Sequence, residues 1–363
     1  MIDLKTLLRT AMEKQASDLH IKMGSAPHIR VNGELAPVDS IPPSTKAETL
    51  DLAQHLLNAR QREILAEKSE VDLSFGVEGL GRFRVALFHQ RGSISMVFRL
   101  IPDEVLSLQA LQLPEVLTEI AGERRGLILV TGTTGSGKST TLASMINHIN
   151  KTRRSHVITI EDPIEFLMRD NLAFISQREV AIDTSSFASA LRSALRQDPD
   201  VIMVGEMRDL ETVQIAMQAA ETGHLVMSTL HTTDAIETVH RIISVFPTHQ
   251  QHDIRLQLAS VLNAIISMRL IRSSISGGRI PAVEILRNTE LVRSLISQAE
   301  RTKEIKHALE TGGTQYGMQS FDQSIFEHHQ KGVISTEDAL QNATSPQDLK
   351  LRIQGIVSSS DEA

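Results

Sequence analysis

A short apolar run that leads directly into a glycine-rich loop constrains this fold more than any other feature of the sequence. Residues 127–130 predict a buried strand, and residues 139–149 fit a helix. Between them lie Gly132, Thr133, Thr134, Gly135, Ser136, Gly137, Lys138 and Ser139. Glycines permit a tight path and positive φ values, so the backbone amides of such a loop can surround a chain of phosphates. Strand, loop and helix occur in the order that a phosphate-binding loop requires, which predicts a nucleoside triphosphate site that extends to Thr140.

Two side chains at the end of this loop have predicted roles of their own. Lys138 would place a positive charge on the β- and γ-phosphates, and the hydroxyl of Ser139 would bind Mg²⁺. The nearby sequence Asn150-Lys151-Thr152-Arg153 lacks the aspartate that would recognise a guanine base. ATP and Mg²⁺ are therefore the predicted nucleotide and metal.

Composition narrows the class of protein. The 363 residues, 41% of them hydrophobic, are enough for two globular units with separate cores. The net charge of -7 is mild and argues against a protein that wraps duplex nucleic acid, so no nucleic-acid partner is expected. The absence of cysteine excludes disulfides and thiolate metal sites. No apolar run approaches the ~18 residues that span a bilayer, so we expect a cytoplasmic chain that reaches a membrane only through a partner.

Residues 1–100 read as a mixed α/β domain. An opening helix is followed by a hairpin at Asn32-Gly33, a middle helix over about 45–68 and further strands. In the strand 82–88 the side chains of Arg82 and Arg84 share one face, while apolar residues face the core. A strand over 94–100 is expected to pair with it, and residues 101–115 are predicted to be a linker.

From residue 116 the pattern changes to short apolar strands that alternate with helices. Strands at 127–130, 157–160, 201–204 and 225–228 predict a parallel sheet covered by helices, within a domain spanning 116–345. After residue 245 the chain reads as helices, with apolar stripes in 254–272, 289–310 and 320–330. Residues 346–363 form a predicted tail, in which 358–363 look disordered.

Chemically active side chains follow each of the four predicted strands. The phosphate loop follows the first strand, Glu161 the second, Glu206 the third and His231 the fourth. The carboxyl ends of parallel strands meet at one edge of a sheet, so these groups should converge there. ATP hydrolysis needs an oriented water and a carboxylate, and Glu206 is also placed to hold Mg²⁺, directly or through water. The sequence does not separate the general base from the metal holder between Glu161 and Glu206.

Arg82 and Arg84 lie outside the predicted nucleotide domain. An exposed strand face is one explanation for two such arginines. The other is an arginine finger delivered across domains or subunits, which is worth ~10³–10⁵ in rate.

The motifs taken together resemble the secretion-superfamily ATPases. In chain order they are Ser17-Asp18-Leu19-His20, Gly81-Arg82-Phe83-Arg84-Val85, the loop at 132–140, Ile160-Glu161-Asp162-Pro163-Ile164-Glu165, Gly205-Glu206-Met207-Arg208-Asp209 and Ser228-Thr229-Leu230-His231-Thr232-Thr233. The compact length and Gly317-Met318-Gln319-Ser320-Phe321-Asp322-Gln323 resemble the type IV pilus retraction branch, the PilT and PilU group. The stretches 291–296, 334–340 and 348–352 are closer to its PilU-type members.

This resemblance implies an α/β architecture with a PAS-like domain at 1–100 and a RecA-like P-loop ATPase domain at 116–345. It implies a hexameric ring with ATP between subunits, docked on the cytoplasmic face of an inner-membrane pilus platform protein. A PilT-type paralogue is a further implied partner. The implied roles, position by position, are Walker A for Lys138 and Ser139, Asp box for Glu161 and Glu165, Walker B for Glu206, His box for His231, and N-domain arginines for Arg82 and Arg84.

Other functions remain open at this point. Assembly and type II secretion motors usually carry a tetracysteine zinc insertion, which a chain without cysteine lacks, so an extension motor is the weaker interpretation. A nucleotide-gated accessory module and a DNA-translocating motor are two further functions that these motifs allow.

Overall fold

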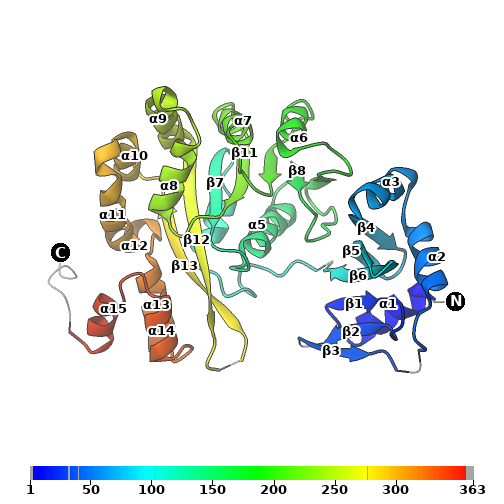
Figure 1. Ribbon diagram of the computed structural model, residues 1–363. Helices are drawn as coiled ribbons and strands as arrows, with labels where there is room; N and C mark the ends of the chain where they lie inside the picture. The colour runs from blue at the N-terminus through cyan, green and yellow to red at the C-terminus, as the bar shows by residue number, and fades with distance from the viewer. Residues whose placement is uncertain (1–2, 32, 40, 103, 276, 357–363) are drawn as a thin grey trace. The chain divides into compact units, whose positions relative to one another are not determined.

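The computed structural model describes residues 3–31, 33–39, 41–102, 104–275 and 277–356 (Figure 1). The chain divides into two compact units. The first comprises Met1–Glu104 with Glu165–Leu167, and the second comprises Val105–Ile164 with Met168–Ala363. The α/β fold class predicted from the sequence is confirmed.

The first unit is an antiparallel sheet covered by helices. Its strands lie in the order β3-β2-β1-β6-β5-β4, and helices and strands pack around one apolar core. The elements are α1 (Leu4–Glu13), β1 (Asp18–Ile21), β2 (His28–Val31), β3 (Glu34–Pro37), α2 (Lys46–Leu56), α3 (Ala59–Lys68), β4 (Glu70–Val77), β5 (Gly81–Gln90) and β6 (Ser93–Ile101).

The strand pairings expected in this unit are confirmed. β2 pairs with β3, and β5 pairs with β6. The alternation along β5 is also as predicted, because Phe83 and Val85 are buried while Arg84 is exposed. The hairpin turn between β2 and β3 contains Asn32, which lies outside the described residues.

The single helix predicted over about 45–68 is wrong, because two helices occupy that stretch. α2 ends where Leu57 adopts an extended backbone, and the side chain of Asn58 then caps α3 in a capping box with Gln61. An asparagine followed three residues later by glutamine is a helix-start signal, and it outweighs the apolar periodicity that crosses this point.

The second unit is built on a sheet in the order β13-β12-β7-β11-β10-β8-β9. Its strands are β7 (Gly126–Thr131), β8 (His156–Glu161), β9 (Phe174–Glu179), β10 (Val201–Val204), β11 (Leu225–Leu230), β12 (Leu262–Arg272) and β13 (Arg279–Arg287). The four predicted strands are confirmed as β7, β8, β10 and β11, and they pair in parallel. At one edge of the sheet, β13 runs antiparallel to β12.

Helices cover both faces of this sheet. They are α4 (Val116–Ala121), α5 (Lys138–Thr152), α6 (Phe187–Ala194), α7 (Leu210–Glu221), α8 (Ala235–Ser244), α9 (Gln251–Val261), α10 (Glu290–Ser297), α11 (Ile305–Thr311), α12 (Gly313–Tyr316), α13 (Phe321–Gln330), α14 (Thr336–Asn342) and α15 (Pro346–Ile353), with the 3-10 turns η1 (Thr248–Gln250) and η2 (Ala299–Glu304). Successive side chains of β7 pack in two different hydrophobic cores. Leu127 and Leu129 join the core that contains α6 and α7, whereas Ile128 and Val130 join the core that contains α4 and α5.

The helix predicted over 254–272 is wrong in its second half. Residues 262–272 form β12, which pairs with β7, and β13 pairs with β12 inside the region expected to be helical. Ile265 and Ile266 are both fully buried, so this strand is apolar on both faces and shows no alternation. A buried strand of this kind cannot be distinguished from a buried helix by periodicity.

The remaining C-terminal helices are partly as expected. The 320–330 helix is confirmed as α13, and the 289–310 stretch is interrupted, with η2 between α10 and α11. Residues 346–353, predicted to be tail, form α15, which buries Leu349 in a small core with α13 and α14. Residues 358–363 lie outside the described residues. Within the described ranges, no helix has both the length and the apolar character to cross a bilayer.

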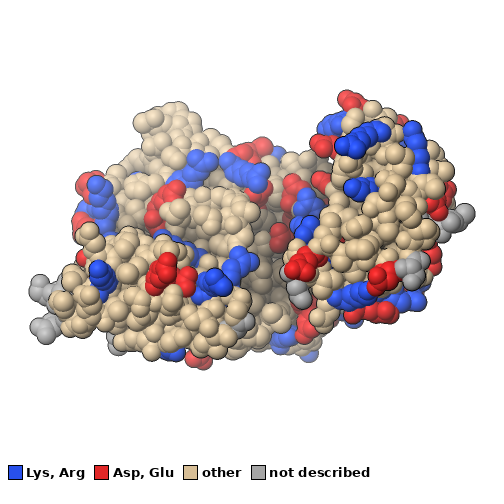
Figure 2. Space-filling model, turned by 60° about the horizontal axis from the view of Figure 1, so that its bottom comes forward, with Lys and Arg blue, Asp and Glu red and all other residues tan. Residues whose placement is uncertain are grey.

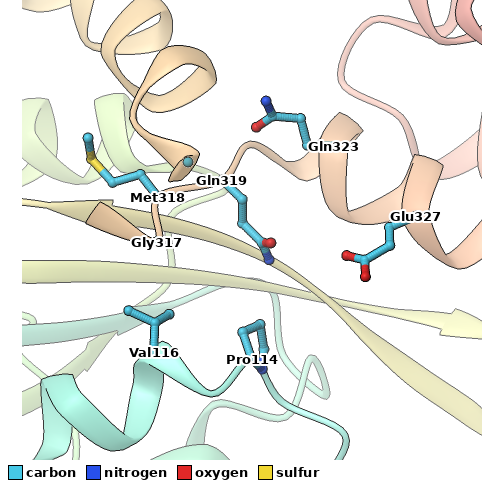
Figure 3. A pocket seen from close by; sticks show the side chains of 8 residues that line it. Pro114, Val116, Gly317, Met318, Gln319, Gln323 and Glu327 are labelled. Atoms are coloured by element: carbon cyan, nitrogen blue, oxygen red, sulfur yellow. The ribbon is translucent and has the colours of Figure 1, made fainter. Parts of the chain in front are cut away.

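The backbone at Gly317 lies close to the side chain of Val116, and both residues line the pocket shown in Figure 3. Gly317 ends α12 with φ +65°, and a Cβ placed on it would lie 2.8 Å from Cγ2 of Val116. Three residues further on, Ser320 and Gln323 form the capping box of α13. Val116 and Pro114 line an open pocket of about 400 Å³ together with residues of the segment that begins at Gly317.

Replacing Gly317 by alanine should therefore lower the free energy of unfolding by about 2–4 kcal/mol, from left-handed backbone strain and the clash with Val116. Gly332 is a matched control, since it has φ +68° but nothing within 4 Å of an added Cβ. Gly332→Ala should cost about 1–2 kcal/mol, from the left-handed backbone alone. Urea unfolding of both variants measures the difference, and equal losses would rule out the Val116 contact as the reason for this glycine.

One carboxyl group of the second unit is deeply buried. Burial raises the pKa of Glu284, in β13, to about 7, against the opposing hydrogen bond from the Ala235 amide; the charge of Asp234 adds to the rise, and that of Arg269 opposes it. The folded state thus holds this proton more tightly than the unfolded chain does.

The stability that Glu284 contributes should be complete below pH 4.5 and lost as the pH rises to about 7. At 1.36 kcal/mol per pKa unit, the raised pKa changes the free energy of unfolding by at most about 3 kcal/mol. Chemical unfolding of wild type and Glu284→Gln at about pH 5 and about pH 8 isolates the contribution of Glu284, because the other titratable groups ionise equally in the two proteins. Wild type should lose stability relative to the variant at the higher pH; a constant difference would contradict the raised pKa.

Candidate nucleotide-binding site

The phosphate loop joins the buried strand β7 to the N-terminus of α5, and its glycines are required by geometry. A Cβ on Gly132 would lie 2.5 Å from Oγ of Ser136 and 2.6 Å from the carbonyl oxygen of Met268, so the loop closes against β12. Gly137 has φ +96° and begins α5. The hydroxyl oxygen of Ser136 is buried and has no hydrogen-bond partner within the described structure.

Lys138 is held over this loop. Its side chain is only 7% exposed, and Nζ donates hydrogen bonds of 2.9 Å to the carbonyl oxygens of Gly132 and Thr133. Ser139 and Thr140 follow in the first turn of α5 and are half-buried, whereas Thr133, Thr134 and Gly135 are exposed. The ammonium group is thus fixed at the position where the loop amides and the helix N-terminus gather.

Glu161 ends β8 and is held by two side chains. Thr159, on the same face two residues earlier, donates a 2.7 Å hydrogen bond to its Oε1, and Gln177 of β9 donates one of 3.1 Å to the same atom. Glu161 is 7% exposed. The carboxylate is therefore positioned by donors from its own strand and from the neighbouring one.

Glu206 follows β10 at the same edge of the sheet and meets His231. Its Oε2 lies 3.5 Å from Nε2 of His231 and 2.7 Å from Nε of Arg208. The Glu206 side chain is 17% exposed, and the hydroxyl of Thr229, two residues before His231, binds the carbonyl oxygen of Gly205 at 2.6 Å. The ends of β10 and β11 thus bring a carboxylate and an imidazole into contact.

The other predicted site residues belong to the first unit. Arg82, Arg84 and Glu165 all lie there, while the phosphate loop, Glu161, Glu206 and His231 lie in the second. The predicted site residues are therefore divided between the two units. The phosphate loop, Glu161, Glu206 and His231 are brought together within the second unit.

Three arginines and one aspartate of the first unit form a row across its sheet. Arg30, Asp18, Arg99 and Arg84 stand opposite one another on β2, β1, β6 and β5. Nε of Arg99 donates a 2.8 Å hydrogen bond to the buried Asp18, which also lies 4.0 Å from Arg30. Nη2 of Arg84 lies 3.8 Å from Asp72, and its side chain is 45% exposed. Asp18 therefore holds Arg99 and Arg30, and Arg84 keeps access to solvent.

Several residues that shape the site escaped the sequence analysis. Thr159 could have been found, because it precedes Glu161 by two positions in a strand and so shares its face. Arg208 lies within a motif already recognised, but nothing in the sequence shows its contact with Glu206. Gln177 could not have been found, because β9 was not predicted.

The second unit fits a nucleotide with its phosphates at residues 132–140. The loop is a cradle that a Cβ at Gly132 would fill, and the buried hydroxyl of Ser136 is a free hydrogen-bonding group inside it. Amides at the N-terminus of a long helix and a lysine ammonium are the donors that phosphate requires.

Comparison with known proteins agrees with this geometry. The model of the family described as Type II/IV secretion system protein matches residues 1–347. The chain is 44% identical over 346 residues to the type IV pilus retractation ATPase PilT of Pseudomonas aeruginosa, covering 95% of this chain and 99% of that one. It is 41% identical over 353 residues to the type IV pilus ATPase PilU of the same species, covering 97% and 92%.

Solved structures give the same result. The crystal structure of the pilus retraction motor PilT with bound ADP superposes with a TM-score of 0.89 at 43% identity, covering 96% of this chain and 99% of that one. The ATPase DotB of Legionella pneumophila superposes with a TM-score of 0.80 at 28% identity, covering 98% and 96%. This chain therefore belongs to the Type II/IV secretion system protein family and is an ATPase of its PilT and PilU group.

Proposed function

We propose that this protein is a motor that hydrolyses ATP at the phosphate loop of its second unit to drive retraction of a type IV pilus. The observation that carries the proposal is the convergence of the phosphate loop, Glu161, Glu206 and His231 at the ends of neighbouring strands. The near full-length similarity to two type IV pilus ATPases supports the same function.

Each group has a part in this chemistry. Lys138 and the loop amides bind the phosphates and neutralise charge that develops on them. Glu206 orients the attacking water or accepts its proton, and Glu161 is the alternative for either role. His231, 3.5 Å from Glu206, is placed to sense whether the terminal phosphate is present. When bound, Mg²⁺ would neutralise phosphate charge, held by the Ser139 hydroxyl and, directly or through water, by Glu206.

The division of the site residues favours an assembly of several copies. Arg82 and Arg84 lie in a different unit from the phosphate loop. A cation supplied in trans is a common means of stabilising phosphoryl transfer. We therefore propose a homo-hexamer in which the first unit of one subunit completes the nucleotide site of another, with Glu165 as a further member.

Mixing two inactive variants tests this arrangement. Subunits with Arg82→Ala and Arg84→Ala should be inactive, as should subunits with Lys138→Ala. Mixed rings should regain part of the ATPase activity, because some interfaces pair an intact phosphate loop with intact arginines. The measurement is ATP turnover across a range of mixing ratios.

A control mixture combines the Lys138→Ala subunit with a Glu206→Gln subunit, whose defects both lie in the second unit. No activity should return there if every interface takes its loop and its carboxylate from one subunit. If the arginine mixture also stays inactive at every ratio, the arginines do not act in trans.

The partner is proposed from the resemblance to the type IV pilus retraction group. We propose an inner-membrane platform protein of the pilus machinery as the surface on which the ring acts, which would place the protein in the cytoplasm at that membrane. Tagged protein should follow the platform protein on membranes and be released when the platform gene is deleted.

The similarity to PilU favours a second candidate, an accessory subunit that modulates a PilT-type motor and hydrolyses little ATP alone. Identity to the two P. aeruginosa proteins is nearly equal, 44% and 41%, so overall identity does not separate the branches. ATPase assays of the chain with and without its PilT-type paralogue decide. Little turnover by the chain alone, together with a turnover of the mixture that differs from that of the paralogue alone, would favour the accessory role.

A motor that moves along nucleic acid is a weaker candidate. Basic and acidic side chains are interspersed on the face shown in Figure 2, in agreement with the net charge of -7. A DNA motor would bind single strands with a steep salt dependence, which a filter-binding assay would detect.

A further inference from the structure

A row of polar side chains crosses the three neighbouring strands β7, β12 and β13, next to the phosphate loop. The three strands are labelled in Figure 1. Thr131 of β7 stands opposite Ser267 of β12, which stands opposite Glu284 of β13. All three are buried, with Glu284 only 7% exposed. Burial of such groups is costly unless each is hydrogen-bonded, so their bonds are expected to be specific.

The row is joined by hydrogen bonds that all run toward Glu284. The Thr131 hydroxyl donates to Oγ of Ser267 at 3.1 Å, and the Ser267 hydroxyl donates to Oε1 of Glu284 at 3.3 Å. The backbone N–H of Ala235 donates to the same Oε1 at 2.8 Å. Glu284 is therefore the shared acceptor for two donors that reach it from different directions.

One end of this series of hydrogen bonds lies at the beginning of the phosphate loop. Thr131 is bonded covalently to Gly132, and Met268, next to Ser267, packs against the loop. The hydroxyl of Thr141 lies 3.0 Å from Sδ of Met268, and Cε of Met268 lies 3.5 Å from the position of a Cβ on Gly137. A shift of β12 would thus move the floor of the loop.

The other end is the segment that contains His231. Ala235 is the first residue of α8, which packs on β12 and β13. The first turn of that helix holds the preceding residues: the hydroxyls of Thr232 and Thr238 are 2.6 Å apart, and Thr233 donates its N–H to Glu237 at 2.6 Å. The position of His231 beside Glu206 therefore depends on where α8 begins.

We propose that Glu284 is a positioning residue that ties the start of the phosphate loop to the start of α8, so that the loop and His231 keep a fixed separation. The inference rests on the proposed ATPase site and deepens it. Glu284 does not contact the reacting atoms; it acts through Thr131 on one side and Ala235 on the other.

Other charged groups lie near Glu284, but they do not accept the hydrogen bonds that Ser267 and Ala235 donate to it. Asp234 caps α8, and Asp322 of α13, Lys306 and Glu310 line a cavity of about 70 Å³ beside it. Arg269 of β12 stacks on Phe321 and donates to the carbonyl oxygen of Asn342 at 2.6 Å.

Four variants separate positioning from general stability. Glu284→Gln keeps an oxygen that can accept both hydrogen bonds, and Glu284→Leu removes it at similar volume. Ser267→Ala removes the hydrogen bonds of Ser267 to Thr131 and to Glu284, and it leaves the hydrogen bond from Ala235 to Glu284 in place. Ile280→Val is the matched control, because Ile280 lies in the same strand as Glu284 but packs in the separate small core that contains α13 and α14.

Amide hydrogen exchange measures the protection of the backbone at Ala235 and in the loop 132–140, and it does not require ATP turnover. In Glu284→Leu, exchange should quicken at least ~10-fold both at Ala235 and in the loop 132–140. In Ser267→Ala it should quicken in the loop while Ala235 stays protected. Glu284→Gln and Ile280→Val should exchange as wild type does at both ends.

Turnover supplies the second readout. Glu284→Leu should lose ~10²-fold in kcat, and Glu284→Gln should stay within about threefold of wild type. The double variant Ser267→Ala/Glu284→Leu should be no worse than Glu284→Leu alone, since both changes break one chain. A folded Glu284→Leu protein with wild-type exchange at both ends, or a Gln variant as impaired as the Leu variant, would overturn the inference. If wild type hydrolyses no ATP, the proposed function fails, while the exchange pattern still decides the role of Glu284.

Discussion

Replacing Lys138 by alanine should lower ATP turnover by roughly 10²–10³-fold, the loss expected when a fixed donor to developing phosphate charge is removed. The ammonium group is almost fully buried and is held by the carbonyl oxygens of Gly132 and Thr133. A shorter side chain cannot reach phosphates placed against the same loop, so nucleotide affinity should fall as well. Titration with a fluorescent ATP analogue and a steady-state ATPase assay measure the two effects.

The fold should survive this change, because α5 is anchored by Leu142, Met145, Ile146 and Ile149 in the core. Lys151→Ala is a matched control in the same helix, since Lys151 is exposed in the last turn. Its turnover should equal that of wild type. Full ATPase activity in Lys138→Ala would remove the basis for assigning hydrolysis to this loop.

Glu206→Gln should retain ATP binding and lose hydrolysis by ~10²–10⁴-fold. The amide has the shape of the carboxylate and can still lie beside His231, but it cannot accept a proton from water. Single-turnover assays with preloaded ATP separate binding from chemistry.

Two further glutamates complete this test. Glu211→Gln, in the exposed first turn of α7 where Glu211 pairs with Arg192, should leave turnover unchanged. Glu161→Gln addresses the question left open between the two strand-end carboxylates. Normal turnover in Glu206→Gln together with loss in Glu161→Gln would assign the essential carboxylate to Glu161.

The sequence was most informative where local chemistry determines structure. The strand–loop–helix around residues 127–149 has a pattern with a single physical solution, and it was predicted correctly. The convergence of Glu206 and His231 followed from a rule about parallel strands, without knowledge of any contact between them. The arginine alternation in β5 was likewise readable, since strand faces repeat every second residue.

What escaped prediction depends on pairing between distant segments. β12 resembles a helix until its pairing with β7 is known, and the alignment of Thr131 with Ser267 and Glu284 exists only through that pairing. The support of Glu161 by Gln177 similarly requires the register of β9 beside β8. Such residues have no local signature, because their partners lie far away along the chain.

The most direct test of the central claim is pilus retraction in living cells of a strain that lacks this gene. Fluorescently labelled pili should retract when the strain carries the wild-type gene or the Glu211→Gln control. With Glu206→Gln, produced at the same level, pili should extend but fail to retract. Retraction at wild-type frequency and speed in the Glu206→Gln strain would contradict a motor driven by hydrolysis at this site.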